Sequence, residues 1–252
     1  MSASFLKDYF SDNSGRYSTY RPTYPRELFQ YLASVSPTNE KAWDCACGTG
    51  QSALGLSEHF ENVIATDASE NQIKKAIPND AILYRVSPAE HADIPDNEAD
   101  IITVAQALHW FHIESFFKEA DRVLKKNGIL AVWTYNLLTV NEETDFKIND
   151  LYSEVLGPYW PEERQMVEDG YSEIDFPFSI IDTPSFEMQV EWNALQLIGY
   201  IETWSAVKKF KKENDPEKIT NFFEEILGLW QDPNEKKRIH WPLTVIVQRK
   251  VS

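Results

Sequence analysis

The chain has 252 residues, enough for one large domain with a substantial core, and 42% of them are hydrophobic. Its 40 acidic side chains outnumber its 24 basic ones, which gives a formal net charge of −16. This balance argues against a general nucleic-acid binder, which needs a basic surface to displace phosphate counterions, and against adsorption to an anionic membrane.

No apolar run approaches the roughly 20 residues that span a bilayer. The segment from Met1 to Asp12 lacks the basic and then apolar order of a secretory signal. The two cysteines, Cys45 and Cys47, make no disulfide framework, and nothing nearby in the sequence completes a metal-ligand set, so we interpret them as small packing residues. We therefore expect a cytoplasmic protein without a membrane span or a bound metal.

The first half of the chain predicts alternating strands and helices. Short helices are expected at 5–10 and 26–33, on either side of a tyrosine-rich connector. The strands are expected at 41–46, 63–66, 81–86, 101–104 and 129–134, and the further helices at 52–59, 71–76 and 116–124. We expect Gly128, after Asn127, to end the last of these helices at positive φ. Such alternation is typical of βαβ units with a parallel sheet covered on both faces.

The alternation ends after Tyr135. Residues 142–172 are expected to be helical and rich in loops, and 186–192 alternate apolar and polar residues as a sixth strand does. A long amphipathic helical stretch over 193–230 is interrupted near Asp215–Pro216, and a final strand lies within 241–249. The sequence therefore predicts an α/β fold with a doubly wound, mostly parallel seven-stranded sheet and a helical cap insertion.

A glycine-bearing turn joins the first strand to the next helix, with the sequence WDCACGTGQ over 43–51. Glycines at such a turn let the backbone approach a ligand, and the start of a helix offers unpaired N–H donors. Gly48, Gly50 and Ala53 satisfy the relaxed dinucleotide-binding pattern, which by itself is a weak signal.

Asp44, at the entrance of this turn, discriminates between two kinds of ligand. A carboxylate there would repel the pyrophosphate of a nicotinamide dinucleotide. S-adenosylmethionine has no phosphate and carries an ammonium and a sulfonium, so an aspartate suits its cationic amino-acid end. The alternative interpretation is a simple glycine turn with a solvated Asp44.

Two further sites follow the second and third strands. Asp67 ends the second strand, where an acidic group can accept hydrogen bonds from both ribose hydroxyls; alternatively, it caps the following helix. Ala89 and Glu90 follow the third strand and would lie beside the adenine edge, with backbone amides and the Glu90 carboxylate as polar anchors. The alternative for this pair is an ordinary loop.

With these motifs in place, the sequence resembles the class I S-adenosylmethionine-dependent methyltransferases of the type 11 group, similar to the trans-aconitate and ubiquinone-biosynthesis methyltransferases. The resemblance is strong over 10–135 and looser over 136–252. It implies cofactor roles for Asp44 to Gly50, Asp67, Ala89 and Glu90, and it places Ala105 and Gln106 beside the methionine part of the cofactor. Ala46 stands where many members have glycine. Alanine is small enough to keep the close backbone approach if its φ is negative, so we expect an altered cofactor affinity without loss of binding.

The N-terminal segment 17–25 matches the family's tyrosine- and arginine-bearing stretch. Tyr17, Tyr20 and Arg21 precede the sheet and could fold over the amino-acid end of the cofactor. Arg21 could pair with its carboxylate through a planar fork of donors, and an aromatic face attracts a sulfonium. The alternative is that these tyrosines form a hydrophobic clasp on the domain.

Methyl transfer requires alignment of the acceptor and exclusion of water, with a base only if the acceptor must lose a proton. His109 is the candidate base, because its loop follows the fourth strand, at the sheet edge where ligands bind; the alternative is a structural histidine. His112 and His91 are weaker candidates, and His59 and His240 have the character of surface or packing residues. The aromatic residues expected to line an acceptor pocket are Trp110, Trp133, Tyr135, Tyr200 and Trp204, although aromatics at helical spacing are more often core.

We therefore expect one methyltransferase domain over 1–252 that uses S-adenosylmethionine, yields S-adenosylhomocysteine and acts on a small-molecule acceptor through a group such as a carboxylate or a hydroxyl. It is expected to be a monomer or weak homodimer with no nucleic-acid partner. The alternatives are a nicotinamide-dependent oxidoreductase and a non-catalytic cofactor-binding protein. The expected parts are N-terminal helices covering the cofactor (1–35), a cofactor-binding core (36–135), a cap and substrate region (136–232) and the last strand (241–249).

Overall fold

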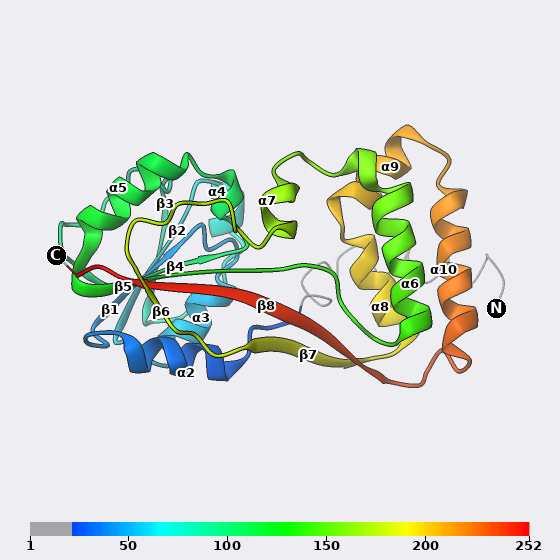
Figure 1. The fold of residues 1–252 in the computed structure, drawn as a ribbon, viewed down its shortest axis with the longest axis horizontal. Helices are drawn as coiled ribbons and strands as arrows, with labels where there is room; N and C mark the ends of the chain where they lie inside the picture. The colour runs from blue at the N-terminus through cyan, green and yellow to red at the C-terminus, as the bar shows by residue number, and fades with distance from the viewer. Residues whose placement is uncertain (1–21, 252) are drawn as a thin grey trace. The chain divides into compact units, whose positions relative to one another are not determined.

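The computed structural model describes residues 22–251, and the chain divides into two compact units (Figure 1). The sheet unit comprises 23–136, 163–187 and 242–251, and the helical unit comprises 22, 137–162 and 188–241 among the described residues. Within the described residues, no helix is long and apolar enough to cross a membrane. Each unit is described below by itself.

A mostly parallel sheet forms the centre of the sheet unit, with the strand order β3-β2-β1-β4-β5-β8-β6. Parallel pairs join β3 to β2, β2 to β1, β1 to β4 and β4 to β5, while β8 is antiparallel to both β5 and β6. A further strand, β7, pairs with β8 off this path, so the sheet has eight strands. The strands are β1 (Lys41–Cys45), β2 (Asn62–Asp67), β3 (Ile82–Val86), β4 (Ala99–Ala105), β5 (Leu124–Tyr135), β6 (Ser179–Ile181), β7 (Phe186–Trp192) and β8 (Lys237–Arg249).

The central strands are buried because helices cover both faces of the sheet. On one face, α2 (Arg26–Val35) and α3 (Gln51–Ser57) pack against side chains that include Ala42 and Trp133. On the other face, α5 (Ile113–Val123) packs against side chains that include Trp43 and Val132. Figure 1 shows α5 on the opposite side of the strands from α2 and α3. The predicted doubly wound α/β architecture is confirmed.

The end of α5 differs from the sequence prediction. The helix ends at Val123, and β5 begins at the next residue, Leu124. The positive φ of 64° belongs to Asn127 and not to Gly128, whose added Cβ would lie 2.9 Å from the Lys125 carbonyl. Asparagine tolerates the left-handed region better than most side chains, so it can take the turn while glycine permits the close approach.

Shorter elements surround the ends of the strands. They are α4 (Glu70–Ile73), a 3₁₀ turn η1 (Leu108–Trp110) and α7 (Arg164–Glu168). The helix α4 is shorter than the predicted 71–76, because Pro78 follows closely and disfavours helix before it. The strand β6 was not predicted, since three residues give too short an alternating pattern to detect.

The helical unit contains α6 (Glu142–Asp150), a π turn η2 (Leu151–Val155), a 3₁₀ turn η3 (Gly157–Tyr159), α8 (Ala194–Glu202), α9 (Ser205–Glu213) and α10 (Glu217–Trp230). The predicted stretch 193–230 is therefore three helices, with a second break at Thr203–Trp204. Asn193 and Gln196 form a capping box that starts α8. The core of this unit is aromatic, with ring contacts among Tyr152, Trp160, Trp192, Tyr200, Trp204 and Trp241.

Candidate functional site

The loop between β1 and α3 has left-handed backbone at three residues. The φ angle is 56° at Ala46, 57° at Gly48 and 90° at Gly50. The Cys47 N–H donates to the Thr66 carbonyl at 2.9 Å, which ties the loop to β2. The condition of negative φ at Ala46 is therefore not met, and the hydrogen bond from Cys47 to β2 fixes the backbone at the next residue. The left-handed conformation costs an alanine roughly 1–2 kcal/mol.

The two glycines of the loop have different surroundings. A Cβ added to Gly48 would meet no atom of residues 22–251 within 4 Å, so among these residues nothing covers its backbone. A Cβ added to Gly50 would lie 2.2 Å from the Tyr84 Oη, whose hydroxyl donates to the Ile77 carbonyl at 3.0 Å. Gly50 is therefore required by internal packing, whereas Gly48 offers a place where a ligand can approach the main chain.

Asp67 connects the loop to the carboxyl end of β2. Its Oδ2 accepts the Gly48 N–H at 2.9 Å, and its Oδ1 accepts the Ser69 N–H at 2.8 Å. The side chain is half-buried, so part of the carboxylate faces outward beside the exposed backbone of Gly48. The contact with Ser69, the residue that precedes α4, fits the alternative of a turn-stabilising aspartate, and the contact with Gly48 brings two predicted cofactor residues together.

Asp44 lies beneath the loop in the interior of the sheet and is fully buried. The Thr103 hydroxyl donates to its Oδ1 at 2.8 Å, and the Ser52 side chain and the Ala53 backbone at the start of α3 also interact with the carboxyl group. Burial raises the pKa of Asp44 to about 7, although these hydrogen bonds lower it. The carboxyl group beneath the loop is therefore partly protonated and partly ionised at neutral pH.

Ala89 and Glu90 lie in a turn after β3. Ala89 is buried, and the Glu90 Oε1 accepts the His112 N–H at 2.9 Å. His112 is the N-cap residue of α5, so Glu90 places a negative charge at the helix N-terminus. This contact gives Glu90 a structural role in addition to the predicted contact with adenine.

Ala105 and Gln106 lie where β4 ends, and both are half-buried. The Gln106 Nε2 donates to the Tyr135 carbonyl at 2.8 Å, and its Oε1 accepts the Thr134 hydroxyl at 2.7 Å. The φ of Gln106 is 54°, in the left-handed region. Its side chain thus fastens the ends of β4 and β5 to each other at the predicted ligand edge.

His109 lies in η1, directly after this loop, and is half-buried. Its Nδ1 is 3.0 Å from the Tyr171 Oη, and the two rings stack with centroids 6.3 Å apart. Burial, and secondarily the charge of Arg164, lowers the pKa of His109 to about 4. His109 is therefore neutral near pH 7, with one ring nitrogen carrying a lone pair.

The predicted pocket aromatics of the sheet unit have different environments. Trp110 is 59% exposed, and Tyr135 is half-buried. Trp133 is fully buried, with Tyr24 packed edge-on against it at a centroid distance of 5.4 Å. Trp110 and Tyr135 can therefore reach a ligand as the structure stands, whereas Trp133 belongs to the core under α2.

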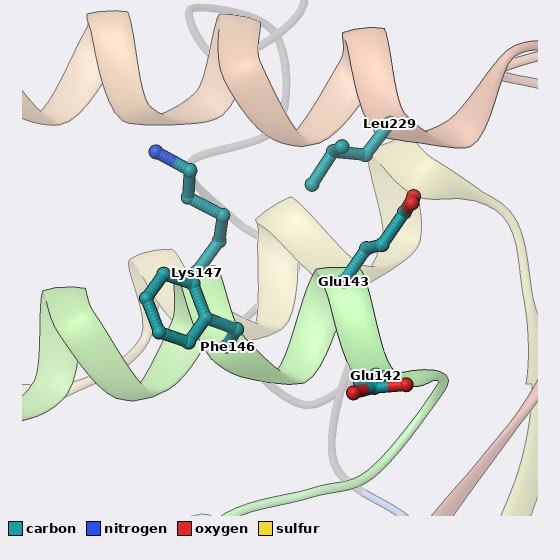
Figure 2. A pocket seen from close by; sticks show the side chains of 5 residues that line it. All are labelled: Glu142, Glu143, Phe146, Lys147 and Leu229. Carbon is teal, nitrogen blue, oxygen red and sulfur yellow. The ribbon is translucent and has the colours of Figure 1, made fainter.

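Tyr200 and Trp204 lie in the helical unit, where their rings contact each other edge-on at 6.0 Å. Tyr200 is buried, and its hydroxyl accepts the Trp241 Nε1–H at 3.2 Å. The same unit carries an open groove of about 590 Å³, lined by Glu142, Glu143, Phe146, Lys147 and Leu229 (Figure 2). The groove lies along α6 and α10, and none of its lining residues is a predicted site residue.

Tyr17, Tyr20 and Arg21 lie outside the described residues. The sequence analysis missed Tyr171 and Thr134, because a tyrosine in an irregular segment and a threonine in a buried strand carry no periodic signal. A signal that could have pointed to Tyr171 is the preceding Gly170, since a Gly–aromatic pair after a short helix suggests a tight turn. Gly170 and Tyr171 both have positive φ, 59° and 62° respectively.

The comparisons with known proteins all indicate a methyltransferase. The family described as "Methyltransferase domain" matches residues 43–132. A Dictyostelium discoideum protein assigned as a methyltransferase is 30% identical over 250 residues, with 96% of this chain and 95% of that protein covered. A Saccharomyces cerevisiae protein assigned as an S-adenosylmethionine-dependent methyltransferase is 23% identical, with 94% and 95% covered. A solved structure of a protein from Anaeromyxobacter dehalogenans, assigned as a type II methyltransferase, is 36% identical with a TM-score of 0.88, with 92% of this chain and 99% of that chain covered.

Proposed function

The chain belongs to the class I S-adenosylmethionine-dependent methyltransferases, and from this premise we propose that it transfers the methyl group of S-adenosylmethionine to a small-molecule acceptor. The observation that carries the proposal is the pairing of Gly48 and Asp67. No side chain in the described part of the molecule covers the Gly48 backbone, and its N–H is held by the Asp67 carboxylate at the end of β2.

The residues of the loop fit this cofactor. Bare backbone at Gly48 leaves room for a ligand to approach, and the half-buried Asp67 has lone pairs left for ribose hydroxyls. The buried carboxyl group of Asp44 lies below the loop, where its charged form would be favoured by a nearby cation. A pyrophosphate would instead lie beside the Asp44 carboxyl group, which disfavours a nicotinamide dinucleotide.

When bound, the cofactor supplies a methyl group on a cationic sulfur, so that an acceptor lone pair bonds to carbon while the carbon–sulfur bond breaks and S-adenosylhomocysteine is left. The residues of the chain orient the two partners and exclude water. We assign Asp67 to the ribose and the turn at Ala89 and Glu90 to the adenine. Gln106 holds the ends of β4 and β5, and Tyr17, Tyr20 and Arg21 are proposed to cover the amino-acid end of the cofactor.

The acceptor side of the proposal rests on the aromatic residues. Trp110 and Tyr135, both in the sheet unit, are proposed to contact a largely apolar acceptor. We further propose a cytoplasmic enzyme that acts as a monomer or weak homodimer. A net charge of −16 disfavours nucleic acid as the substrate, and methyl transfer from sulfonium needs no metal.

Calorimetric titration of the protein with S-adenosylmethionine, S-adenosylhomocysteine, NAD and NADP tests the cofactor. We expect binding of the first two only. Asp67→Ala should raise their Kd by about 100-fold, because two hydrogen bonds to a charged group are lost. Asp121→Ala is the matched control. Asp121 is an exposed aspartate near the end of α5 and the start of β5, whereas Asp67 lies at the carboxyl end of β2.

Unchanged affinity of the Asp67→Ala protein, with its near-ultraviolet circular dichroism preserved, would overturn the proposal. Tight binding of NAD would favour the oxidoreductase instead. A screen with radiolabelled cofactor against carboxylates, phenols, alcohols and amines tests catalysis. Tight cofactor binding without transfer to any acceptor would identify a non-catalytic binding protein.

A further inference from the structure

The loop 87–96, which contains the turn that we assign to the adenine, is fastened to α5 at two levels of the helix. At the N-terminus of α5, the His112 N–H donates to the Glu90 Oε1 at 2.9 Å. About two helical turns further along, the Glu119 Oε1 accepts the Ala92 N–H at 2.6 Å. Residues at this spacing lie on one face of a helix, so a single face of α5 holds the loop.

Arg122, on the same face of α5, binds the loop through two backbone carbonyls. Its Nη1 donates to the Ile94 carbonyl at 2.8 Å, and its Nη2 donates to the Ala92 carbonyl at 3.2 Å. The remaining N–H groups donate to the two Glu119 oxygens at 2.7 and 2.9 Å and to the Asp96 Oδ1 at 2.6 Å. Every N–H of the guanidinium therefore has an acceptor, and a lysine has too few donors to replace it.

Glu119 is a buried charge that these bonds hold in place. The residue is 6% exposed. Although burial raises the pKa of Glu119, the hydrogen bonds from Arg122 and from the Ala92 N–H, together with the Arg122 charge, lower it below its usual range. A buried ion pair adds little net stability compared with apolar packing, and its best-attested role is to specify one arrangement. Here the pair fixes both the N–H and the carbonyl of one loop residue, Ala92.

The loop between β3 and Ala92 has little freedom once that residue is fixed. The Ser87 Oγ donates to the His91 carbonyl at 3.1 Å, which closes the turn upon itself. The side chains of Ala89 and Ala92 are buried in the same core cluster as Phe116 of α5. The adenine turn therefore cannot move relative to α5 without loss of these hydrogen bonds and of this packing.

We propose that Glu119 and Arg122 are positioning residues that hold the turn at Ala89 and Glu90, so that the site selects adenine over hypoxanthine. This inference rests on the proposed function, in which that turn contacts the adenine. The adenine amine donates to an acceptor such as the Glu90 carboxylate. Hypoxanthine has a carbonyl oxygen in place of the amine, which a carboxylate repels. Selection between the two bases requires the acceptor to stay in place, because a displaced turn binds both bases weakly and more alike.

Calorimetric titration with S-adenosylhomocysteine and S-inosylhomocysteine measures this selection, because the two ligands differ only in the purine. We expect the wild-type protein to bind the adenosyl compound on the order of 100-fold more tightly. Arg122→Lys keeps the charge but cannot reach both carbonyls, so it should reduce this ratio about tenfold. Glu119→Gln should reduce the ratio too, since one amide oxygen cannot serve both Ala92 and the guanidinium.

Asp96→Asn is the matched control for these two variants. It removes an ion pair of the same arginine, but the Asp96 side chain is 68% exposed, and the bonds from Arg122 to the two backbone carbonyls remain. The wild-type ratio of the two affinities should therefore be retained in Asp96→Asn. A purely stabilising ion pair would weaken both ligands equally in the Arg122 and Glu119 variants and would leave the ratio unchanged.

Amide hydrogen exchange of the unliganded protein measures the position of the loop without any cofactor. The Ala92 N–H should exchange at least tenfold faster in Arg122→Lys and in Glu119→Gln, while the amides of β1 and β4 keep their protection. An unchanged affinity ratio in both variants, or unchanged exchange at Ala92, would overturn the inference. Failure of the proposed function would appear in the wild-type protein, as binding of neither ligand, and would overturn both. Failure of this inference alone would appear only in the variants.

Discussion

Thr103 and Asp44 lie directly opposite each other on the neighbouring parallel strands β4 and β1, and the Thr103 hydroxyl donates to the Asp44 Oδ1 at 2.8 Å. The carboxyl group is fully buried, and the Ser52 side chain and the Ala53 backbone also interact with it. These hydrogen bonds do not offset the loss of hydration, so burial raises the pKa to about 7. The core of the sheet therefore contains an acid that titrates in the physiological range.

Replacement of Asp44 by asparagine should change the pH dependence of stability. Because the folded-state pKa is raised from 3.8 to about 7, the folded protein holds a proton that the unfolded chain releases. The stabilising contribution of that proton is complete below pH 3.8 and is lost as the pH rises through 7. By pH 8 the cost of ionising Asp44 is on the order of 4 kcal/mol. The asparagine side chain of the Asp44→Asn variant keeps an acceptor for Thr103 and cannot ionise.

Urea unfolding of the wild-type and Asp44→Asn proteins between pH 5 and pH 8 measures this difference. We expect the two curves to be close at pH 5 and the variant to be the more stable at pH 8. Asp121→Asn, at an exposed position, should show no such divergence. Parallel stability curves for Asp44→Asn and wild type would contradict the raised pKa.

Ala46→Gly should stabilise the protein. Alanine at φ 56° is strained by roughly 1–2 kcal/mol, and glycine removes that strain while adding some entropy to the unfolded chain. We expect a net gain of about 1 kcal/mol, seen as a higher urea midpoint with an unchanged slope. Ala33→Gly in the last turn of α2 is the control and should lose up to about 1 kcal/mol. A destabilised Ala46→Gly protein would show that the methyl group makes contacts that outweigh the strain.

The two loop glycines should respond differently to alanine. Gly48→Ala should cost the positive-φ strain, about 1–2 kcal/mol, because no atom of the described residues lies within 4 Å of the new methyl group. The methyl group fills the space proposed for the cofactor, so the Kd for S-adenosylmethionine should rise at least tenfold. Gly50→Ala also forces the Tyr84 ring away, and it should reduce stability more than Gly48→Ala does. Calorimetric binding and thermal melting of both variants distinguish the two effects, and an unaltered Kd for Gly48→Ala would place the cofactor elsewhere.

The loop residues show how much of this fold can be predicted from the sequence. Strand and helix order through β5 follows from local periodicity, and the position of the glycine loop follows from the strand–turn–helix pattern. The sign of φ at Ala46 does not follow from the local sequence. The hydrogen bond from Cys47 to Thr66 ties the loop to the neighbouring strand and overrides the preference of alanine for negative φ. Likewise, the burial of Trp133 depends on α2 folding over the sheet, which a single aromatic residue in a strand cannot reveal.

The same limit applies to the contacts of His109. Its place after β4 could be predicted from the order of elements. Its partner Tyr171 is 62 positions away, in a segment whose conformation depends on strained backbone. Pairings at such separation are set by tertiary packing, and no local pattern encodes them.

Glu90 tests whether one side chain serves both the fold and the cofactor. Its Oε1 accepts the His112 N–H at 2.9 Å at the start of α5, so Glu90→Ala should cost about 1 kcal/mol of stability through the lost cap and the lost charge at the helix N-terminus. Glu90→Gln keeps an acceptor oxygen and should lose less than half of that. If the carboxylate also anchors the adenine amine, Glu90→Gln should still weaken S-adenosylmethionine several-fold, since the bond to a charged acceptor becomes a neutral one. Urea unfolding and calorimetry on the same two variants separate these roles: reduced stability with unchanged affinity in Glu90→Ala would assign Glu90 to the helix cap alone.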